Sequence, residues 1–256
     1  MQEQIADHVK ELLGRGEIAG FLGLRQSADG HIGPYLFRRP DELRHLSLGD
    51  RHQPGDSRYP LPKLISRLLA AEPQARFGIL VRGCEERALW RLMSDDRVHP
   101  VSRRRVVMVG FACPAELAQS CQCRKPWPDH LVAGRPAPAA PPPPEPEGDL
   151  ARQLEEWFQT CQRCLKCFGC RDVCPVCSCL ECTLEEESFL PQRELPPDRR
   201  FLLTRAVHMI DRCVYCGLCE MTCPAHIPLK GLYRLVARLM SPEAAAPRPL
   251  PGAVQS

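Results

Sequence analysis

The 256-residue sequence has no apolar run long enough to span a bilayer. A transmembrane helix needs about eighteen or more consecutive apolar residues, and no stretch of the chain approaches that length. The first residues, Met1 to Asp7, also lack the basic and apolar regions of a secretory leader. We therefore expect a cytoplasmic protein without direct membrane insertion, which contacts a membrane only through a partner.

The chain also lacks an excess of either charge. It carries 34 Lys and Arg against 31 Asp and Glu, and no block of basic residues interleaves with aromatic ones, as it does in many nucleic-acid-binding surfaces. We expect no nucleic-acid partner. What the chain has in abundance is cysteine, with sixteen residues. In a reducing compartment such cysteines bind metals more often than they form disulfides.

Eight of these cysteines form two runs with the same spacing. The runs are Cys164-Leu-Lys-Cys167-Phe-Gly-Cys170-Arg-Asp-Val-Cys174-Pro175 and Cys213-Val-Tyr-Cys216-Gly-Leu-Cys219-Glu-Met-Thr-Cys223-Pro224. Two, two and three residues separate the cysteines, and a proline follows the fourth. This pattern is typical of proteins with two 4Fe-4S clusters, in which the fourth cysteine of each run binds the other cluster.

The geometry of a cubane explains this spacing. Three thiolates on one tight loop can each reach a different iron, while the fourth points away. The predicted ligands are Cys164, Cys167, Cys170 and Cys223 for the first cluster and Cys213, Cys216, Cys219 and Cys174 for the second. Gly169 and Gly217 fit, because a residue without a Cβ lets the backbone approach sulfide. Zinc ribbons or a disulfide framework are the alternatives, but tetrahedral zinc does not need the doubled spacing.

Apolar segments of strand length alternate with helical periodicity over residues 1–133. The predicted strands are Ile18–Leu24, Phe77–Val81 and Val106–Val109, with a further one near Tyr35–Phe37. Helical patterns cover residues 4–13 and 61–70 and follow Cys84 and Cys113. This alternation predicts an α/β domain with a mostly parallel sheet covered on both faces.

A different organisation is predicted for the rest of the chain. The proline-rich residues 134–148 are expected to form a semi-rigid polyproline II linker. Helical patterns without strand signals flank both cysteine runs over residues 149–241, which predicts an α-helical ferredoxin domain. Residues 242–256 are rich in proline and alanine and are expected to be disordered.

Four cysteines of the first domain form another candidate site. Cys84 and Cys113 each follow a predicted strand, at the edge of the sheet where α/β proteins bind ligands, and each precedes a predicted helix, whose dipole favours a thiolate. Cys121 and Cys123 follow closely and can fold back to Cys113. Metal ligands explain this group best, with zinc, reactive thiols or buried thiols as alternatives.

Two segments of this domain resemble a known family. Val81-Arg-Gly-Cys84-Glu-Glu-Arg-Ala-Leu89 and Val109-Gly-Phe-Ala-Cys113-Pro114 resemble the β-subunit family of deazaflavin-reducing hydrogenases and formate dehydrogenases. The cysteine-rich half resembles the iron–sulfur region fused to such subunits in formate dehydrogenase and heterodisulfide reductase-type complexes. The resemblance implies that Cys84, Cys113, Cys121 and Cys123 bind a third 4Fe-4S cluster. Here one residue separates the last two cysteines, where the family has two.

The resemblance also implies a function. We expect an iron–sulfur subunit that relays single electrons between a catalytic formate dehydrogenase or hydrogenase subunit and a heterodisulfide reductase-like or flavin partner. The alternative is a flavin-dependent reductase of deazaflavin or a nicotinamide, with FAD as a possible cofactor. A domain ending near residue 133 leaves little room for FAD, and the Gly-x-Gly-x-x-Gly fingerprint is absent. A zinc-stapled scaffold is a third possibility.

Several residues near the cysteine runs remain outside this assignment. A further cluster, exposed thiols, alternative ligands and an interface site are all open for four of them: Cys161, Cys177, Cys179 and Cys182. His208 and His226 are expected to be surface or capping residues rather than ligands. Arg163, Lys166 and Arg171 either offset the charge of an anionic cluster or form a solvated basic face.

Overall fold

The computed structural model describes residues 1–94, 101–141, 148–179, 181–191 and 194–240. The chain divides into two compact units, Met1–Pro142 and Pro143–Ser256. Among the described residues, no helix is both long and apolar enough to cross a membrane. The predicted tail, residues 242–256, and residues 142–147 of the predicted linker lie outside the described residues.

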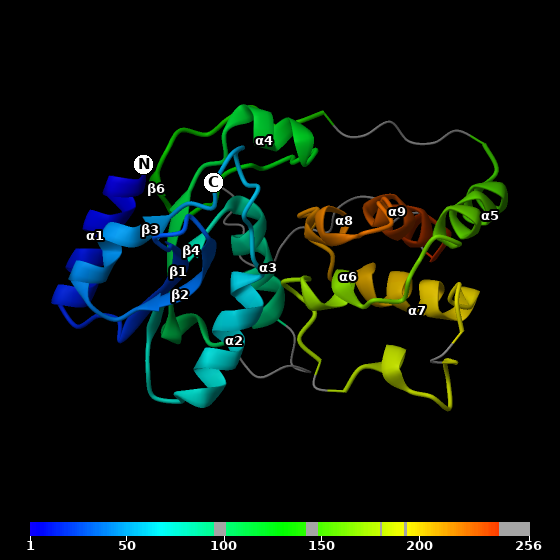
Figure 1. Ribbon diagram of the computed structural model, residues 1–256, viewed down its shortest axis with the longest axis horizontal. Coiled ribbons are helices and arrows are strands. Elements are labelled where there is room, and N and C mark those ends of the chain that lie inside the picture. Colours follow the sequence, from blue (N-terminus) through cyan, green and yellow to red (C-terminus); the bar gives the residue numbers. More distant parts are fainter. Residues whose placement is uncertain (95–100, 142–147, 180, 192–193, 241–256) are drawn as a thin grey trace. The chain divides into compact units, whose positions relative to one another are not determined.

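A mixed six-stranded sheet forms the centre of the first unit (Figure 1). Its strands lie in the order β2-β1-β4-β5-β6, and β3 pairs with β1 beside this path. The bounds are β1 (Gly20–Gln26), β2 (Ile32–Phe37), β3 (Leu46–Ser47), β4 (Phe77–Val81), β5 (Val106–Phe111) and β6 (Leu131–Ala133). The pairs from β1 through β4 and β5 to β6 are parallel, whereas β2 and β3 run antiparallel to β1. The predicted α/β fold with a mostly parallel sheet is therefore confirmed.

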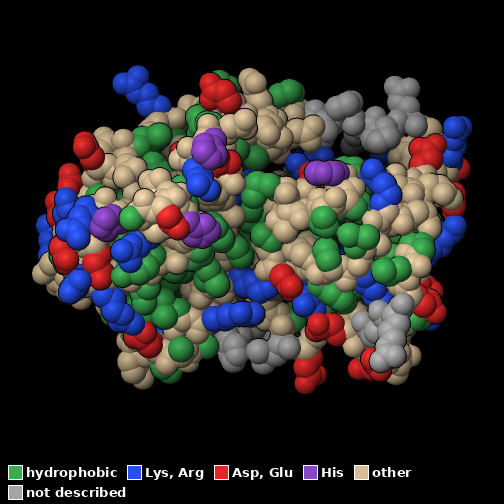
Figure 2. All heavy atoms as spheres, in the orientation of Figure 1, with side chains coloured by type: hydrophobic (Ala, Val, Ile, Leu, Met, Phe, Trp, Pro, Cys, Tyr) green, Lys and Arg blue, Asp and Glu red, His purple; other side chains and the backbone are tan. Residues whose placement is uncertain are grey.

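Helices cover both faces of this sheet, with α1 on one side and α2 and α3 on the other (Figure 1). The helices are α1 (Gln2–Gly14), η1 (Pro40–His45), α2 (Leu61–Ala71), α3 (Gly83–Met93), η2 (Arg103–Arg105) and α4 (Ala115–Ser120). Every residue of β4 is buried, as expected for a strand covered on both faces. Basic and acidic side chains are interspersed over the face drawn in Figure 2, in line with the small net charge.

The described residues of the second unit form helices and no strand. They are α5 (Leu150–Cys161), α6 (Gly169–Asp172), η3 (Thr183–Glu185), α7 (Arg199–Met209), α8 (Leu218–Thr222) and α9 (Leu229–Met240). Asp149 caps α5 by accepting hydrogen bonds from the N–H groups of Ala151 and Arg152. Helix α9 packs closely on α5, because a Cβ added at Gly231 would lie 2.5 Å from the Trp157 ring.

The stretch predicted to be a linker begins as part of the first unit. Residues 135–141 form neither helix nor strand, but Ala140 is buried and its N–H donates to the carbonyl of Cys123 at 2.9 Å. The proline-rich composition therefore does not keep these residues away from the folded unit.

Candidate metal centres

Two cavities of the second unit are lined by cysteines. The first measures about 590 Å³ with the open space at its mouth included, and its cysteines are Cys164, Cys167, Cys170 and Cys223. The second measures about 330 Å³ on the same basis, and its cysteines are Cys174, Cys213, Cys216 and Cys219. Each cavity thus receives three cysteines from one run and the fourth from the other. These are the same two groups that the cysteine spacing predicts.

Two short helices carry the fourth cysteine of each run into the cavity of the other run. Helix α6 begins inside the first run and α8 inside the second, and the two helices contact each other. Cys174 lies just after α6 and lines the second cavity. Cys223 follows α8 and lines the first. The three-residue spacing before the fourth cysteine therefore carries it along a helical turn to the neighbouring loop.

Each cysteine run begins with a loop, and the two loops have the same backbone geometry. Lys166 and Tyr215 occupy equivalent positions and have left-handed φ angles of 51° and 53°. The N–H of Lys166 donates to Sγ of Cys164 at 3.4 Å, and that of Tyr215 donates to Sγ of Cys213 at 3.4 Å. Hydrogen bonds of this kind to ligand sulfurs are one of the means by which a protein tunes an iron–sulfur site.

The loops differ at the residue before each short helix. Gly217 has a φ of 79°, which suits a residue without a Cβ, but Phe168 takes the equivalent position with a φ of 58°. Phe168 is held there by an edge-to-face contact with Phe201 and by the Arg171 guanidinium, 4.6 Å from its ring centre. A Cβ at Gly169 would lie 3.6 Å from Sγ of Cys167, an ordinary contact. The left-handed residue directly before α6 is therefore Phe168, and Gly169 does not have a left-handed φ.

Burial keeps several of these thiols protonated. It raises the pKa of Cys170 to about 11 and that of Cys213 to about 12, and it also raises the pKa of Cys219. Iron is bound by the thiolate, not the thiol. Binding in these cavities must therefore release protons and supply positive charge at the same place.

The residues around the cavities fit 4Fe-4S clusters. The hydroxyl of Tyr233 and Nε of Arg205 are buried without a hydrogen-bond partner among the described residues, and both side chains line the second cavity. Such donors suit an acceptor like cluster sulfide. In the described parts of the chain, no three His, Cys, Asp or Glu side chains gather closely enough to hold a single metal ion. A cubane does not need such convergence, because each thiolate binds a different iron.

The third candidate site lies at the ends of two neighbouring strands of the first unit. Strands β4 and β5 pair directly; Cys84 lies in the first turn of α3, and Cys113 follows β5. Burial raises the pKa of Cys84 to about 12 and raises that of Cys113. Besides burial, the charge of Cys113 acts to raise the pKa of Cys84, and the charge of Cys123 acts to raise the pKa of Cys113, so Cys113 lies near both other thiols. Cys121 follows α4 directly.

The segment after Cys123 is held against both strand ends. The N–H of Cys113 donates to the carbonyl of Pro126 at 2.8 Å. A Cβ added at Gly83 would lie 2.5 Å from the carbonyl oxygen of Trp127 and 2.6 Å from that of Lys125. Glycine at position 83 therefore allows this segment to return to Cys84.

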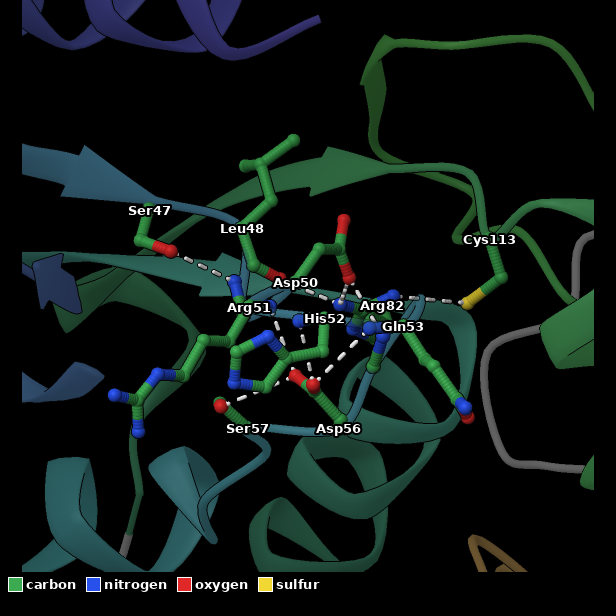
Figure 3. A network of polar contacts seen from close by, with 12 residues as sticks. Ser47, Leu48, Asp50, Arg51, His52, Gln53, Asp56, Ser57, Arg82 and Cys113 are labelled. Carbon is green, nitrogen blue, oxygen red and sulfur yellow. Dashed lines mark hydrogen bonds and ion pairs between the residues drawn. The ribbon is translucent and has the colours of Figure 1, made fainter. Parts of the chain in front are cut away.

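Two arginines lie beside thiols of this group, and Figure 3 shows one of them, Arg82, next to Cys113. Nη1 of the buried Arg82 lies 3.7 Å from Sγ of Cys113, and Nη2 of Arg87 lies 3.6 Å from Sγ of Cys123. Besides burial, the charge of Glu85 raises the pKa of Cys84, and the charges of Arg58 and Arg87 act to lower it. Arg82 also donates to the carbonyl of Leu48 at 2.5 Å and to Asp50 at 3.2 Å, which ties the loop after β3 to the site. Positive charge of this kind suits an anionic cluster.

The same loop is fixed from within by one carboxylate (Figure 3). Asp56 accepts hydrogen bonds from three successive backbone N–H groups, those of Arg51, His52 and Gln53. These bonds hold the pKa of Asp56 well below its usual value. Arg82, which contacts Cys113, is therefore bonded to a loop that has its own network of hydrogen bonds.

The remaining cysteines lie outside the two cavity linings. Three of them contact arginines, with Cys177 beside Arg205, Cys179 beside Arg212 and Cys182 beside Arg171. Cys161 is buried at the end of α5, where burial raises its pKa to about 11. Neither cavity lining includes these four cysteines, His208 or His226.

The basic residues of the first loop separate into three roles. Lys166 is buried and lines the first cavity. Arg171 forms an ion pair of 2.8 Å with Glu185, and Arg163 is exposed. Of these three residues, Lys166 is therefore the one that is in a position to offset the charge of a group in the first cavity.

Sequence reasoning missed three residues of these sites, Arg205, Tyr233 and Arg82. A signal existed for Arg205. It lies three residues after Leu202 and four before Met209, which places it on the buried stripe of α7. An arginine on such a stripe needs an anionic or polar partner.

Part of the chain is similar to a known protein. Over 81 residues, the chain is 42% identical to the F420-dependent formate dehydrogenase subunit beta of Methanocaldococcus jannaschii. The match covers 31% of this chain and 21% of the relative, so the chain spans about a fifth of that protein's length. No protein-family model matches the chain. This partial similarity to a formate dehydrogenase beta subunit agrees with the expected resemblance to the β-subunit family of deazaflavin-reducing hydrogenases and formate dehydrogenases.

Proposed function

We propose that this chain is an iron–sulfur electron-transfer subunit of an oxidoreductase complex. The observation that carries the proposal is the exchange of cysteines between two cavities of the second unit. Cys164, Cys167, Cys170 and Cys223 hold one 4Fe-4S cluster, and Cys213, Cys216, Cys219 and Cys174 hold the other. The partial similarity to a formate dehydrogenase beta subunit supports the same function.

The cluster supplies reversible uptake of single electrons when it is bound. The chain supplies the rest of the site. Besides the thiolates, the N–H groups of Lys166 and Tyr215 donate to ligand sulfurs. Apolar side chains such as Leu232 line the first cavity, and a less polar surrounding strengthens charge interactions.

A third cluster is proposed at Cys84, Cys113, Cys121 and Cys123. Its support is the pairing of β4 with β5 and the close approach of the returning segment to Gly83. The arginines beside the thiols of Cys113 and Cys123 offset the negative charge that such a cluster brings.

The proposed partners are a catalytic dehydrogenase or hydrogenase subunit and an acceptor of the heterodisulfide reductase or flavin type. The name of the similar protein supports the formate dehydrogenase class. Since we identify no general acid–base pair or activated nucleophile among the described residues, we expect the isolated chain to accept electrons without oxidising formate or hydrogen.

Iron analysis of the anaerobically prepared full chain tests the proposal. We expect about twelve irons and twelve labile sulfides, four of each from each of three cubanes. Cys213→Ser and Cys84→Ser should each lower both counts and remove part of the electron paramagnetic resonance signal. Cys179→Ser is the control, because Cys179 is exposed and lines neither cavity. Stoichiometric zinc without labile sulfide, or an equal loss in the control, would contradict the proposal.

A flavin-dependent reductase stays a prediction of the sequence alone. Release of flavin from the anaerobically purified chain on denaturation would support it. A chain whose visible absorption comes from iron–sulfur groups alone would favour the electron-transfer subunit.

A further inference from the structure

We propose that Arg205 sets the reduction potentials of both clusters in the second unit together. Among the described residues, it is the cationic side chain that lines both cysteine cavities. This inference rests on the proposed function, since it concerns the two groups that the cavities would hold. It makes Arg205 a positioning residue for charge and not a ligand.

The geometry joins Arg205 to both cysteine runs. Its side chain extends from α7 and is 5% exposed. Nη2 donates to the carbonyl of Cys170 at 3.1 Å, and Nη1 donates to Sγ of Cys177 at 3.4 Å. Cys170 lines the first cavity, and Cys177 lies three residues after Cys174, which lines the second. One guanidinium group is therefore bonded beside each site.

The charge of Arg205 has no carboxylate partner in the described parts of the chain. No ion pair to Asp or Glu is formed by Arg205 within the described residues, and its Nε is buried without a hydrogen bond there. The nearest aromatic contact is the Tyr233 ring, with a centre 5.9 Å from the guanidinium carbon. A buried charge without a countercharge is strongly unfavourable. Anionic groups in the two cavities supply the missing charge.

The other buried cations at the cavities are already engaged. Lys230 lines the second cavity but not the first, and it forms an ion pair with Glu220 at 3.2 Å. Lys166 lines the first cavity but not the second, and it donates a hydrogen bond to the carbonyl of Pro191. Arg205 differs because it lines both cavities and forms no ion pair with a carboxylate of the described residues.

The consequence concerns the cost of adding an electron. Reduction places one more negative charge in a cavity, and no bond is made or broken. A nearby buried cation stabilises that charge, so its removal favours the oxidised state. We expect the ratio of reduced to oxidised cluster at a fixed potential to fall about tenfold at each site, which for one electron is 59 mV more negative.

The experiment uses the full chain with its clusters, purified without oxygen. Arg205→Met removes the charge but keeps an unbranched side chain, and Arg205→Lys keeps the charge. Arg200→Met is the matched control, because Arg200 lies on the same helix, loses the same charge and is exposed. Iron and sulfide content are measured first. A redox titration with mediators and dithionite, followed by electron paramagnetic resonance, then gives both potentials.

Each outcome decides the proposal. A fall of both potentials in Arg205→Met, with Arg205→Lys and Arg200→Met close to the wild type, supports it. Potentials that stay unchanged, or a shift confined to one cluster or equal in the Arg200 control, overturn it. Loss of iron in both Arg205 variants also overturns it, because Arg205 would then serve assembly. A wild-type chain without clusters refutes the proposed function itself, and that result is read before any variant is compared.

Discussion

Gly83→Ala tests how closely the cysteine segments of the first unit approach each other. The added methyl group would lie 2.5 Å and 2.6 Å from the carbonyl oxygens of Trp127 and Lys125. Both are backbone atoms, so they cannot turn away as a flexible side chain can. The segment after Cys123 must move, and α3, which begins at Gly83, is pushed in the opposite direction.

The size of the effect follows from two opposing terms. Forcing a methyl group into a filled site costs about 1–3 kcal/mol. Replacing glycine also removes freedom from the unfolded chain, which stabilises by about 0.4–1 kcal/mol. The net loss of stability is therefore roughly 1–2 kcal/mol. Because Cys84 is the next residue and Cys123 precedes the displaced segment, the iron content should fall as well, although no thiol has been removed.

Urea unfolding followed by tryptophan fluorescence measures the stability, and iron analysis measures the site. Gly14→Ala is the control, because Gly14 also lies at the end of a helix and its added methyl group would meet no atom within 4 Å. It should leave the iron content unchanged and stabilise slightly. If Gly83→Ala matched this control in both measurements, the close return of the segment to Cys84 would be refuted.

Two further predictions concern packing and pH. Gly231→Ala should destabilise the second unit by about 1–3 kcal/mol, because the new methyl group would lie 2.5 Å from the Trp157 ring. Adding Trp157→Leu to the same chain should recover part of this loss of stability. If the losses of the two single variants simply added up, the contact would be contradicted. The hydrogen bond to Glu86 raises the pKa of His130 above 6.5. The stability that this pair contributes is therefore fully present below pH 6.5. It is lost as the pH rises through the raised pKa that His130 has in the folded state. His130→Ala should flatten this alkaline decline in urea unfolding, and an unchanged slope would count against the pair.

The strand positions of the first unit could be predicted because they depend on local composition. Phe77–Val81 is a continuous apolar run, and the structure has β4 over the same residues. Strand β6 could not be predicted, since Leu131–Ala133 is too short for any periodicity and it depends on pairing with β5. The antiparallel pairing of β2 with β1 is likewise a tertiary property.

The grouping of cysteines in the second unit could be predicted because each group follows from spacing along the chain. The environment of the groups could not. Phe168 in a left-handed conformation contradicts the usual preference for glycine, and its contacts with Phe201 and Arg171 exist only in the folded unit. Arg205 has the pattern of a helix residue, and only the packing of α7 against both cavities gives it a role.

Because Cys174 and Cys223 each line the cavity of the other cysteine run, the two cavities of the second unit depend on each other. Neither cavity has four cysteines until both runs are folded and α6 lies against α8. The first cavity needs Cys223, the last cysteine along the sequence. During synthesis this cavity therefore stays incomplete until Cys223 has left the ribosome. Closure of this long loop precedes any gain from ligand binding. Under the proposed function, a cluster in either cavity has its four thiolates only after both runs have folded, and the loss of either run opens both cavities.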